Sequence, residues 1–496
     1  MILDNPFEIR PAVRAVLSAD PTVFIDAKRV ATTGATLPVH DPATGRVIAL
    51  ASDSDDATVD RAVRSARVAF EDGRWRDMRP ADRERVLLRF ADLVEHAVDE
   101  LAQLETLEQG KSINIARMVE VPGAVEWMRF AAGLSTKITG QTMDVSLPGG
   151  PRRWTAYTRR EAIGVVAAIA PWNFPILIAV WKIMPALAAG CSVVLKPSEV
   201  TPLTALRLAE LAVEAGLPAG VFNVVTGRGA GCGRALVSHP FVAKIAFTGS
   251  TATGKAIGRA AMDGMKRVTL ELGGKNPAIV LADADLGVVI PGLLAAGFLN
   301  GGQICAAASR VYVEAPIFDD LVAGLEAAIG DMNVGAGLDP AAQLTPLASA
   351  AHQAKVRAYL DDARTNSDVR LGVDIPEEGY FARPALVLNP DERLRLFREE
   401  VFGPILGITR VADAEDALAR ANASDLGLVA SLWTRDLNSA MNLMRRIEAG
   451  VVWVNTHLQI DPVTPFGGYK QSGLGSEFGV NWLDAFLDTK SICIAH

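Results

Sequence analysis

Five short apolar runs between residues 163 and 281 constrain the fold of this chain more than any other feature. They cover residues 163–169, 192–195, 221–225, 244–247 and 268–270, and stretches with helical spacing, such as 204–215, separate them. This alternation predicts a parallel sheet with covering helices, an architecture that binds nucleotides at the carboxyl ends of its strands. We therefore expect the functional loops to lie at one edge of this sheet.

The flanking regions extend the α/β pattern. Residues 53–108 carry apolar side chains at helical spacing and follow an expected hairpin around residues 41–45. Beyond residue 305, strand-like runs at 310–314 and 450–455 accompany helical runs at 318–329, 412–423 and 437–447. At about 100 to 200 residues per domain, a chain of 496 residues is expected to form two or three domains.

The composition excludes several classes of protein. With 50% hydrophobic and 21% charged residues the chain is globular, and its formal charge of −8 gives no reason to expect nucleic acid as a partner. The longest apolar runs are interrupted before they reach the roughly 20 residues of a membrane span. Charged residues among the first ten break the apolar core that a signal peptide needs. We expect a cytoplasmic protein without a membrane partner.

Cysteine and histidine usage points away from disulfides and metals. The four cysteines are too few and too scattered for a disulfide framework in a chain of this length. They are Cys191, Cys232, Cys305 and Cys493. The six histidines show no metal-ligand spacing with one another or with cysteine, so no metal is expected.

Cys305 has a different setting from the other cysteines. It ends the Gly-rich segment NGGQIC, and the upstream segment TLELGGK supplies Glu271, so the pair offers a thiol nucleophile and a carboxylate base. If residues 306–308 continue as a helix, the sulfur lies near the backbone N–H groups of a helix start, an electropositive setting that favours thiolate. The alternative is an inert thiol buried in the core.

Two further segments predict a dinucleotide site. The segment KIAFTGSTATGKA reads as strand, Gly-bounded loop and helix, an arrangement that presents N–H groups to phosphate. Ala256 stands where a nucleoside triphosphatase needs Ser or Thr for magnesium, so either a dinucleotide phosphate or a plain turn fits better. The segment at 227–233 lacks GxGxxG spacing and reads as a turn near the cofactor.

Lys196 and Glu199 lie three residues apart after another strand. They suit the ribose hydroxyls of NAD, with Glu199 repelling the extra phosphate of NADP, although a solvated salt bridge is the alternative. Asn173, in APWNFP, can donate its amide to an oxyanion or hydrogen-bond its own turn.

Taken in order, PWNFP, KPSE, FTGSxxxG, ELGGKxP, GQxC, EEVFGP and PFGGYKxSG closely resemble the aldehyde dehydrogenase superfamily over essentially all of residues 20–496. The resemblance implies an α/β fold with a Rossmann-like NAD-binding domain (1–138 and 159–273), an α/β catalytic domain (274–480) and a small β oligomerisation element (139–158 and 481–496). Strands in 141–161 and 489–495 would pair subunits in a homo-oligomer, a dimer or a tetramer.

The resemblance also assigns roles. Cys305 would attack the aldehyde, while Asn173 and the N–H of Cys305 hold the oxyanion. Glu271 would activate the water that cleaves the thioester, which favours the free acid as product over acyl transfer to coenzyme A. Lys182 and Glu477 would relay protons to bulk water. NAD, with NADP as the alternative, would contact Trp172, Lys196, Glu199, Gly249, Ser250, Leu272, Glu400 and Phe402.

The aldehyde is less constrained than the reaction. The segments at 433–436, 451–462 and 489–493 look most like the phenylacetaldehyde dehydrogenase branch of the superfamily. Expected pocket residues, all apolar, are Phe174, Ile178, Trp181, Leu299, Ile304, Leu458, Ile460 and Phe466, some of which can simply pack the core. Such a pocket suits an aryl or medium alkyl aldehyde and offers no carboxylate to a cationic aminoaldehyde.

Two other functions stay open at this level. One is a broad aliphatic or semialdehyde dehydrogenase, and the other is a binding or structural protein that kept the fold without turnover. The intact set of Cys305, Glu271 and Asn173 argues against the second. Ser476 stands where the superfamily often has arginine, which leaves the coupling between subunits open.

Overall fold

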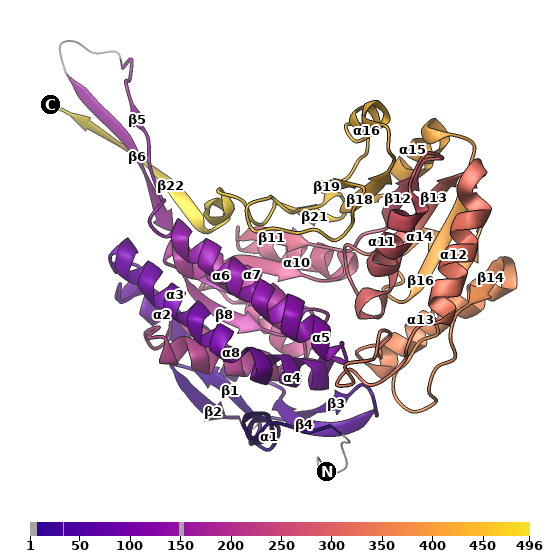
Figure 1. The fold of residues 1–496 in the computed structure, drawn as a ribbon. Helices are drawn as coiled ribbons and strands as arrows, with labels where there is room; N and C mark the ends of the chain where they lie inside the picture. Colours follow the sequence, from indigo (N-terminus) through magenta and orange to yellow (C-terminus); the bar gives the residue numbers. More distant parts are fainter. Residues whose placement is uncertain (1–6, 33, 148–152) are drawn as a thin grey trace.

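Two large mixed sheets and several small antiparallel sheets make up the molecule (Figure 1). The computed structural model describes residues 7–32, 34–147 and 153–496. Residues 1–6, 33 and 148–152 fall within the expected domain ranges but lie outside the described part. The architecture is the α/β class that the sequence predicts.

The first sheet contains the five predicted parallel strands. Its order is β2-β1-β9-β8-β7-β10-β11-β21, with β9 to β11 parallel and the outer strands β1 and β21 antiparallel to their neighbours. The strands are β1 (Thr22–Ile25), β2 (Lys28–Ala31), β7 (Val165–Ile169), β8 (Ser192–Lys196), β9 (Phe222–Val224), β10 (Val242–Thr248), β11 (Arg267–Glu271) and β21 (Gly473–Leu474). Each predicted strand begins and ends within two residues of its expected position.

Helices cover both faces of this sheet because their apolar residues recur at helical spacing. Val59, Ala62, Val63 and Ala66 of α2 (Asp56–Glu71) pack on one face together with α9 (Arg234–Ser238) and α10 (Thr251–Asp263). On the other face lie α7 (Pro175–Ala189) and α8 (Leu203–Glu214). Beyond them are α3 (Pro80–His96), α4 (Val98–Gln109) and α6 (Val121–Leu134). The expected hairpin forms from β3 (Thr36–Asp41) and β4 (Arg46–Ser52).

The second sheet has the order β14-β15-β16-β13-β12-β18-β19 and is parallel except for β14. Its strands are β12 (Asn276–Val280), β13 (Ala308–Glu314), β14 (Asp368–Leu371), β15 (Ala385–Leu388), β16 (Ile405–Val411), β18 (Val429–Trp433) and β19 (Val451–Val454). One face packs on α11 (Leu286–Phe298) and α12 (Phe318–Gly330), and the other on α15 (Ala414–Asn422) and α16 (Leu437–Leu443). α13 (Ala350–Asn366) packs near β15.

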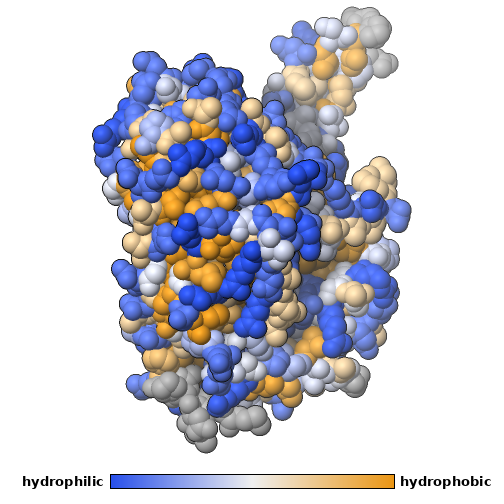
Figure 2. Space-filling view, turned by 90° about the vertical axis from the view of Figure 1, so that its right-hand side faces the viewer, coloured by the Kyte–Doolittle hydropathy of each residue, from blue (hydrophilic) through white to orange (hydrophobic). Residues whose placement is uncertain are grey.

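A narrow arm projects from the body of the molecule. It consists of β5 (Thr142–Met143), β6 (Trp154–Ala162) and β22 (Leu487–Ala495) in one antiparallel sheet. β22 and β6 pair along their whole length, from Leu487 opposite Ala162 to Ala495 opposite Trp154. Figures 1 and 2 both show the arm standing clear of the two large sheets. Part of the strand segment expected at 141–161, residues 148–152, is outside the described residues.

The two sheets face each other across the region that holds the sequence motifs. Because β7, β8, β10 and β11 are parallel, their carboxyl ends meet at one edge of the first sheet. β12 and β13 of the second sheet begin close to the same edge, where Gly274 and Cys305 line one small cavity. Among the described residues, no helix combines the length and the apolar character needed to cross a membrane.

Candidate active site

Two adjoining cavities lie over the carboxyl edge of the first sheet. The larger, of about 760 Å³, is lined by Lys196 and Glu199 at one end. The smaller, of about 240 Å³, reaches Cys305. Both are lined by Pro171, Trp172, Thr248, Gly249 and Ser250, so they form one continuous channel. The segment at 227–233 was predicted to be a turn, but Gly229–Gly233 forms one π-helical turn that leads into α9. Gly229 and Gly233 line the larger cavity.

Cys305 follows a sharp turn that the glycines make possible. Asn300, Gly301 and Gly302 all have left-handed backbone, with φ of 53°, 63° and 73°. A Cβ on Gly302 would lie 2.4 Å from the carbonyl oxygen of Gly403, so this position excludes any side chain. The turn therefore explains the NGG sequence that precedes the nucleophile.

The helix expected after Cys305 does not form. Cys305 and Ala306 lie in a turn, and Ala308 begins strand β13. The pairing of β13 with β12 and β16 in the second sheet outweighs the helical preference of three alanines. The expected helix-start setting for the sulfur is therefore wrong.

The charge environment of Cys305 is also the reverse of the expected one. Burial raises the pKa of its thiol to about 12, and the neighbouring carboxyl groups of Glu400 and Glu271 add to the rise. The backbone N–H groups of Ala306 and of Cys305 itself favour the thiolate but do not offset these effects. The side chain is partly exposed, at the end of the smaller cavity, so an inert core thiol is also not what the structure has.

Asn276 and two glycines hold the loop that carries the nucleophile. The Asn276 Nδ2 donates to the carbonyl oxygens of Cys305 and Ala307, each at 2.8 Å. A Cβ on Gly274 would lie 2.8 Å from the Cys305 oxygen, and one on Gly273 would lie 2.4 Å from Glu400 Oε2. Sequence reasoning missed Asn276, although it directly follows the ELGGK motif.

Glu271, the last residue of β11, is a buried carboxyl group without a partner. Neither of its oxygens accepts a hydrogen bond from any described residue, and only 4% of the residue is exposed. Burial raises its pKa well above the ordinary value, the charge of Glu477 raises it further, and Lys182 acts in the opposite direction. Burying a carboxyl group without a hydrogen bond costs stability, so such a group calls for another explanation, such as a role in catalysis.

Lys182 and Glu477 form a buried ion pair behind Glu271. The Lys182 Nζ lies 2.6 Å from Glu477 Oε1, while Glu477 Oε2 has no partner among the described residues. Lys244, which sequence reasoning missed, lies close enough to both for their charges to affect it. Burial lowers the pKa of Lys244 to about 8, and its Nζ donates to Thr269 Oγ1 at 2.6 Å.

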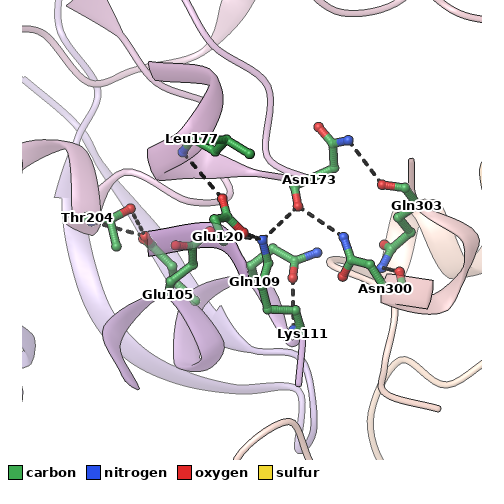
Figure 3. A network of polar contacts seen from close by, with 10 residues as sticks. Glu105, Gln109, Lys111, Glu120, Asn173, Leu177, Thr204, Asn300 and Gln303 are labelled. Atoms are coloured by element: carbon green, nitrogen blue, oxygen red, sulfur yellow. Dashed lines mark hydrogen bonds and ion pairs between the residues drawn. The ribbon is translucent and has the colours of Figure 1, made fainter. Parts of the chain in front are cut away.

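Asn173 is fixed by residues far from it in sequence (Figure 3). Its side-chain Nδ2 donates to the backbone carbonyl of Gln303 at 3.0 Å. The backbone carbonyl of Asn173 accepts 3.0 Å bonds from Lys111 Nζ and Asn300 Nδ2. The side-chain amide of Asn173 therefore does not hydrogen-bond the backbone of its own turn, which was the alternative interpretation. An amide nitrogen has two hydrogens, so one further donor remains.

The predicted adenosine-side residues line the larger cavity. Lys196 is buried, and its Nζ lies 3.6 Å from Glu199 Oε2, whose side chain is 42% exposed. The Ser250 Oγ caps α10 by accepting from Thr253 N, and Gly249 N donates to the Glu271 carbonyl at 3.0 Å. Lys255, which precedes Ala256 where a nucleoside triphosphatase has its phosphate-binding lysine, donates to Gln471 Oε1.

Aromatic residues and Glu400 line the smaller cavity. The Glu400 Oε1 accepts a 3.1 Å bond from Gly274 N, and burial raises the pKa of this carboxyl. Trp172 contacts the rings of Phe402 and His352, with centroids 5.3 and 4.9 Å apart. Leu272 is a further lining residue. Sequence reasoning missed His352, because it lies in α13 outside any motif. Burial lowers the pKa of His352 to about 4, so it lines the cavity as a neutral side chain.

The eight predicted pocket residues share one hydrophobic cluster with Cys305. Ile178, Trp181, Ile304 and Phe466 are buried, whereas Phe174, Leu299, Leu458 and Ile460 are half-buried and pack against the same cluster. Phe478 joins Trp181 and Phe466, with ring centroids 4.8 and 6.0 Å away. The half-buried members have surface left for a ligand, and the buried ones form the layer behind them.

Comparisons with known proteins identify the family. The model of the "Aldehyde dehydrogenase family" matches residues 30–492. The chain is 49% identical to a phenylacetaldehyde dehydrogenase of Pseudomonas fluorescens over 93% of both chains, and 46% identical to an aminoacetaldehyde dehydrogenase of Pseudomonas aeruginosa over 97% of both. The NAD+ complex of an aldehyde dehydrogenase from Bacillus cereus superposes with a TM-score of 0.96 at 39% identity, covering 99% of each chain. By sequence and by structure, the chain belongs to the aldehyde dehydrogenase family, as its motifs predict.

Proposed function

We propose that this aldehyde dehydrogenase uses NAD to oxidise an apolar, aromatic aldehyde of the phenylacetaldehyde type to its carboxylic acid. The observation that carries the proposal is the buried, unpartnered carboxyl of Glu271 close to the partly exposed thiol of Cys305. Folding alone gives no reason to bury a carboxyl group without a hydrogen bond. A base that must accept a proton from water does need free oxygens.

The chemistry follows from these groups. After the thiol proton of Cys305 has left to solvent, the sulfur adds to the carbonyl carbon and the electron pair of the C=O bond moves onto oxygen. The resulting thiohemiacetal oxyanion accepts hydrogen bonds from the Asn173 amide and the Cys305 N–H. NAD, when bound, supplies the acceptor for the hydride that leaves the former aldehyde carbon. Glu271 then takes one proton from water as the water oxygen attacks the remaining thioester; the C–S bond breaks, and the carboxylate product and the Cys305 thiol share the one proton that is left. Lys182 and Glu477 pass the proton from Glu271 toward solvent.

The channel fits a dinucleotide. It runs from the ion pair of Lys196 and Glu199 to Cys305 through the shared wall at Gly249 and Ser250. Lys196 and Glu199 would hold the adenosine ribose, and Gly249 and Ser250 would lie by the pyrophosphate. At the other end, Glu400 would hold the nicotinamide ribose, with Trp172, Leu272 and Phe402 as walls. The exposed carboxylate of Glu199 favours NAD over NADP.

The substrate class rests on the apolar cluster around Cys305. Phe174, Leu299, Leu458 and Ile460 are half-buried apolar residues that pack against the same hydrophobic cluster as Cys305. Two acidic residues, Glu105 and Glu120, lie behind Phe174, but both pair with the Lys111 ammonium. The Lys111 ammonium therefore offsets part of the negative charge behind Phe174, and both acidic side chains are fully buried. A broad aliphatic or semialdehyde oxidation is the alternative.

We also propose the domain division expected from the sequence. Residues 1–138 and 159–273 would bind NAD, residues 274–480 would carry the nucleophile, and residues 139–158 with 481–496 would pair subunits in a dimer or tetramer. The continuous pairing of β6 with β22 supports the last assignment, because it joins these two segments into one structure.

The absorbance of NADH tests the proposal. Purified protein is mixed with NAD and phenylacetaldehyde, with hexanal, succinic semialdehyde and aminoacetaldehyde in parallel and NADP in place of NAD as a further series. We expect the highest kcat/KM for phenylacetaldehyde with NAD. A preference for another aldehyde would overturn the substrate class alone, and no NADH from any aldehyde would overturn the mechanism. Cys305→Ala should abolish oxidation and still bind NAD; loss of NAD binding would contradict the separate roles of the two cavities.

A further inference from the structure

A buried cluster of charged residues lies directly behind Asn173 (Figure 3). Lys111, between α4 and α6, is fully buried, and so are the side chains of Glu105 and Glu120 beside it. None of the three belongs to the motifs that identify the family or to the roles assigned above. A buried cluster of this kind is expensive to desolvate, and apolar replacements often leave stability unchanged or improve it.

The three hydrogens of the Lys111 ammonium have three acceptors. The Lys111 Nζ lies 2.9 Å from Glu105 Oε1, is ion-paired with Glu120 Oε2, and donates to the Asn173 carbonyl at 3.0 Å. The ammonium is therefore fixed by two carboxylates and aimed at one backbone oxygen. Its Nζ also lies 4.3 Å from the centroid of the Phe174 ring, which adds a cation–π contact to the next residue.

The carbonyl that Lys111 holds belongs to the residue whose amide faces the nucleophile loop. The same carbonyl accepts Asn300 Nδ2 at 3.0 Å, and the Asn173 Nδ2 donates to the Gln303 carbonyl at 3.0 Å. Gln303 Nε2 in turn donates to the Asn300 carbonyl at 2.8 Å, which closes a ring of hydrogen bonds. Lys111 thus adds a charged contact from the segment between α4 and α6 to a ring that spans from Asn173 to the turn before Cys305.

The cluster also contacts the first turn of α7, which continues from Asn173. The Glu120 Oε1 accepts a 3.4 Å bond from Leu177 N. Leu177 is half-buried and packs against the cluster that contains Cys305. Backbone on both sides of Phe174 is therefore tied to the same two charged residues.

We infer that Lys111, held by Glu105 and Glu120, is a positioning residue that fixes the Asn173 backbone and so aims its amide at the oxyanion of the thiohemiacetal. This inference rests on the proposed function of Asn173. A geometry error of about 1 Å can cost about 10²-fold in rate, so a contact that acts only on the backbone can matter for the chemical step.

The test is a double-mutant cycle of Lys111→Met and Asn173→Ala. The rate measured is the pre-steady-state burst of NADH at saturating NAD and aldehyde. Since one oxyanion donor contributes about 10²- to 10³-fold, Asn173→Ala should slow the burst by that much. We expect Lys111→Met to slow it about tenfold to a hundredfold in the wild-type background, and by less than about threefold when Asn173 is already alanine.

Two further variants separate positioning from folding. Burial and the neighbouring Glu105 raise the pKa of Glu120 well above its ordinary value. Lys111→Met with Glu120→Gln removes one of the two acidic groups together with the ammonium, so it keeps a folded protein if the single variant leaves too many buried acidic groups without a cation. Lys266→Met is the matched control, because Lys266 is also buried and donates to two backbone carbonyls but precedes β11 at the end opposite Glu271. The control should keep the wild-type burst at saturating NAD.

The outcomes separate the positioning role of Lys111 from the oxyanion role of Asn173. If Asn173→Ala slows the burst and the Lys111→Met effect is the same in both backgrounds, the positioning role is overturned while the oxyanion role stands. If Asn173→Ala leaves the burst unchanged, the proposed role of Asn173 is overturned and the inference with it. A wild-type burst in both Lys111 variants would also overturn the inference.

Discussion

At the residue scale, burial is the main reason why the thiol and the carboxyl of the site hold their protons more tightly than usual. Burial raises the pKa of both Cys305 and Glu271, and the charge of Glu271 contributes to the shift of Cys305. Ionising either group makes ionisation of the other more difficult. The protein without ligand is therefore in a resting state, with a thiol that is difficult to ionise and a carboxyl that holds its proton more tightly than an ordinary glutamate.

This resting state predicts slow alkylation of Cys305. With a pKa of about 12, the thiolate fraction rises about tenfold per pH unit throughout the accessible range. We expect the rate with iodoacetamide to rise at that slope from about pH 7 to pH 10, measured by peptide mass spectrometry of the NAD-free protein. Free glutathione in a parallel sample reports the reactivity of the reagent at each pH. A plateau in the Cys305 rate at or below about pH 8 would contradict the prediction.

The Glu271 base makes a separate prediction. Glu271→Gln should give one burst of NADH and then stall, because the acyl group stays on Cys305, and the steady-state rate should fall by about 10² to 10⁴. Since burial raises the pKa of Glu271, the fraction of carboxylate grows as pH rises, and so should the hydrolysis rate of the wild-type thioester. Single-turnover experiments with mass spectrometry of Cys305 measure both. Unchanged steady-state turnover in the variant refutes the base role.

The sequence predicts some site residues and misses others for a physical reason. Cys305, Glu271 and Asn173 are recognisable because each lies in a motif whose neighbours shape the local backbone. His352, Asn276 and Lys111 act through contacts with residues distant in sequence, such as the bond from Lys111 to the Asn173 carbonyl. A single chain read in order contains no signal of such contacts.

At the scale of elements, a buried carboxyl from one helix caps another. Glu108 of α4 accepts hydrogen bonds from Leu203 N at 2.7 Å and Thr204 N at 3.0 Å, at the start of α8. The residue before α8, Pro202, offers no side-chain cap of its own. Glu108 therefore supplies acceptors that the local sequence lacks.

Glu108→Gln should destabilise the protein without touching the site. Its amide nitrogen cannot accept from Leu203 N, so we expect a loss of about 1.5 to 3 kcal/mol of unfolding free energy. Burial raises the pKa of Glu108 from 4.5 to about 7, so the folded state holds the proton more tightly than the unfolded chain. The stability from this group is full below about pH 4.5 and is lost as pH rises through about 7.

Thermal melting between about pH 5 and pH 8 measures this effect. The gap in Tm between wild type and Glu108→Gln should narrow as the pH rises, because only the wild type has the titrating group. A constant gap would mean that the carboxyl does not titrate in this range, and equal Tm values would mean that the cap adds nothing.

At the scale of elements, strand pairing can also outweigh the secondary structure that the local sequence favours. The regular strands of the first sheet were predictable because each is a short apolar run between turn residues. The residues after Cys305 were not, since three alanines favour a helix locally while β12 and β16 draw Ala308–Glu314 into the second sheet. Pairing partners that arrive from distant parts of the chain decide such cases.

At the scale of the whole molecule, the arm of β5, β6 and β22 leaves one strand edge unpaired within the described chain. Among the described strands, β22 pairs only with β6, so its other edge presents unpaired backbone groups along nine residues. Ile494 of β22 and Met143 of β5 are exposed apolar residues of the same sheet. An exposed strand edge of this length can act as a template for pairing with another chain.

We therefore expect a dimer or tetramer in solution that depends on the arm. Light scattering after gel filtration should give two or four times the mass of one chain for the wild type. Removal of residues 487–496 should shift the protein to a smaller species, because it deletes β22 and leaves β6 without its long partner. Ile494→Lys, which leaves the β22 backbone in place, should weaken the assembly and make its mass depend on protein concentration. A wild-type protein with the mass of one chain at micromolar concentration would show that the free edge of β22 has no partner of its own kind.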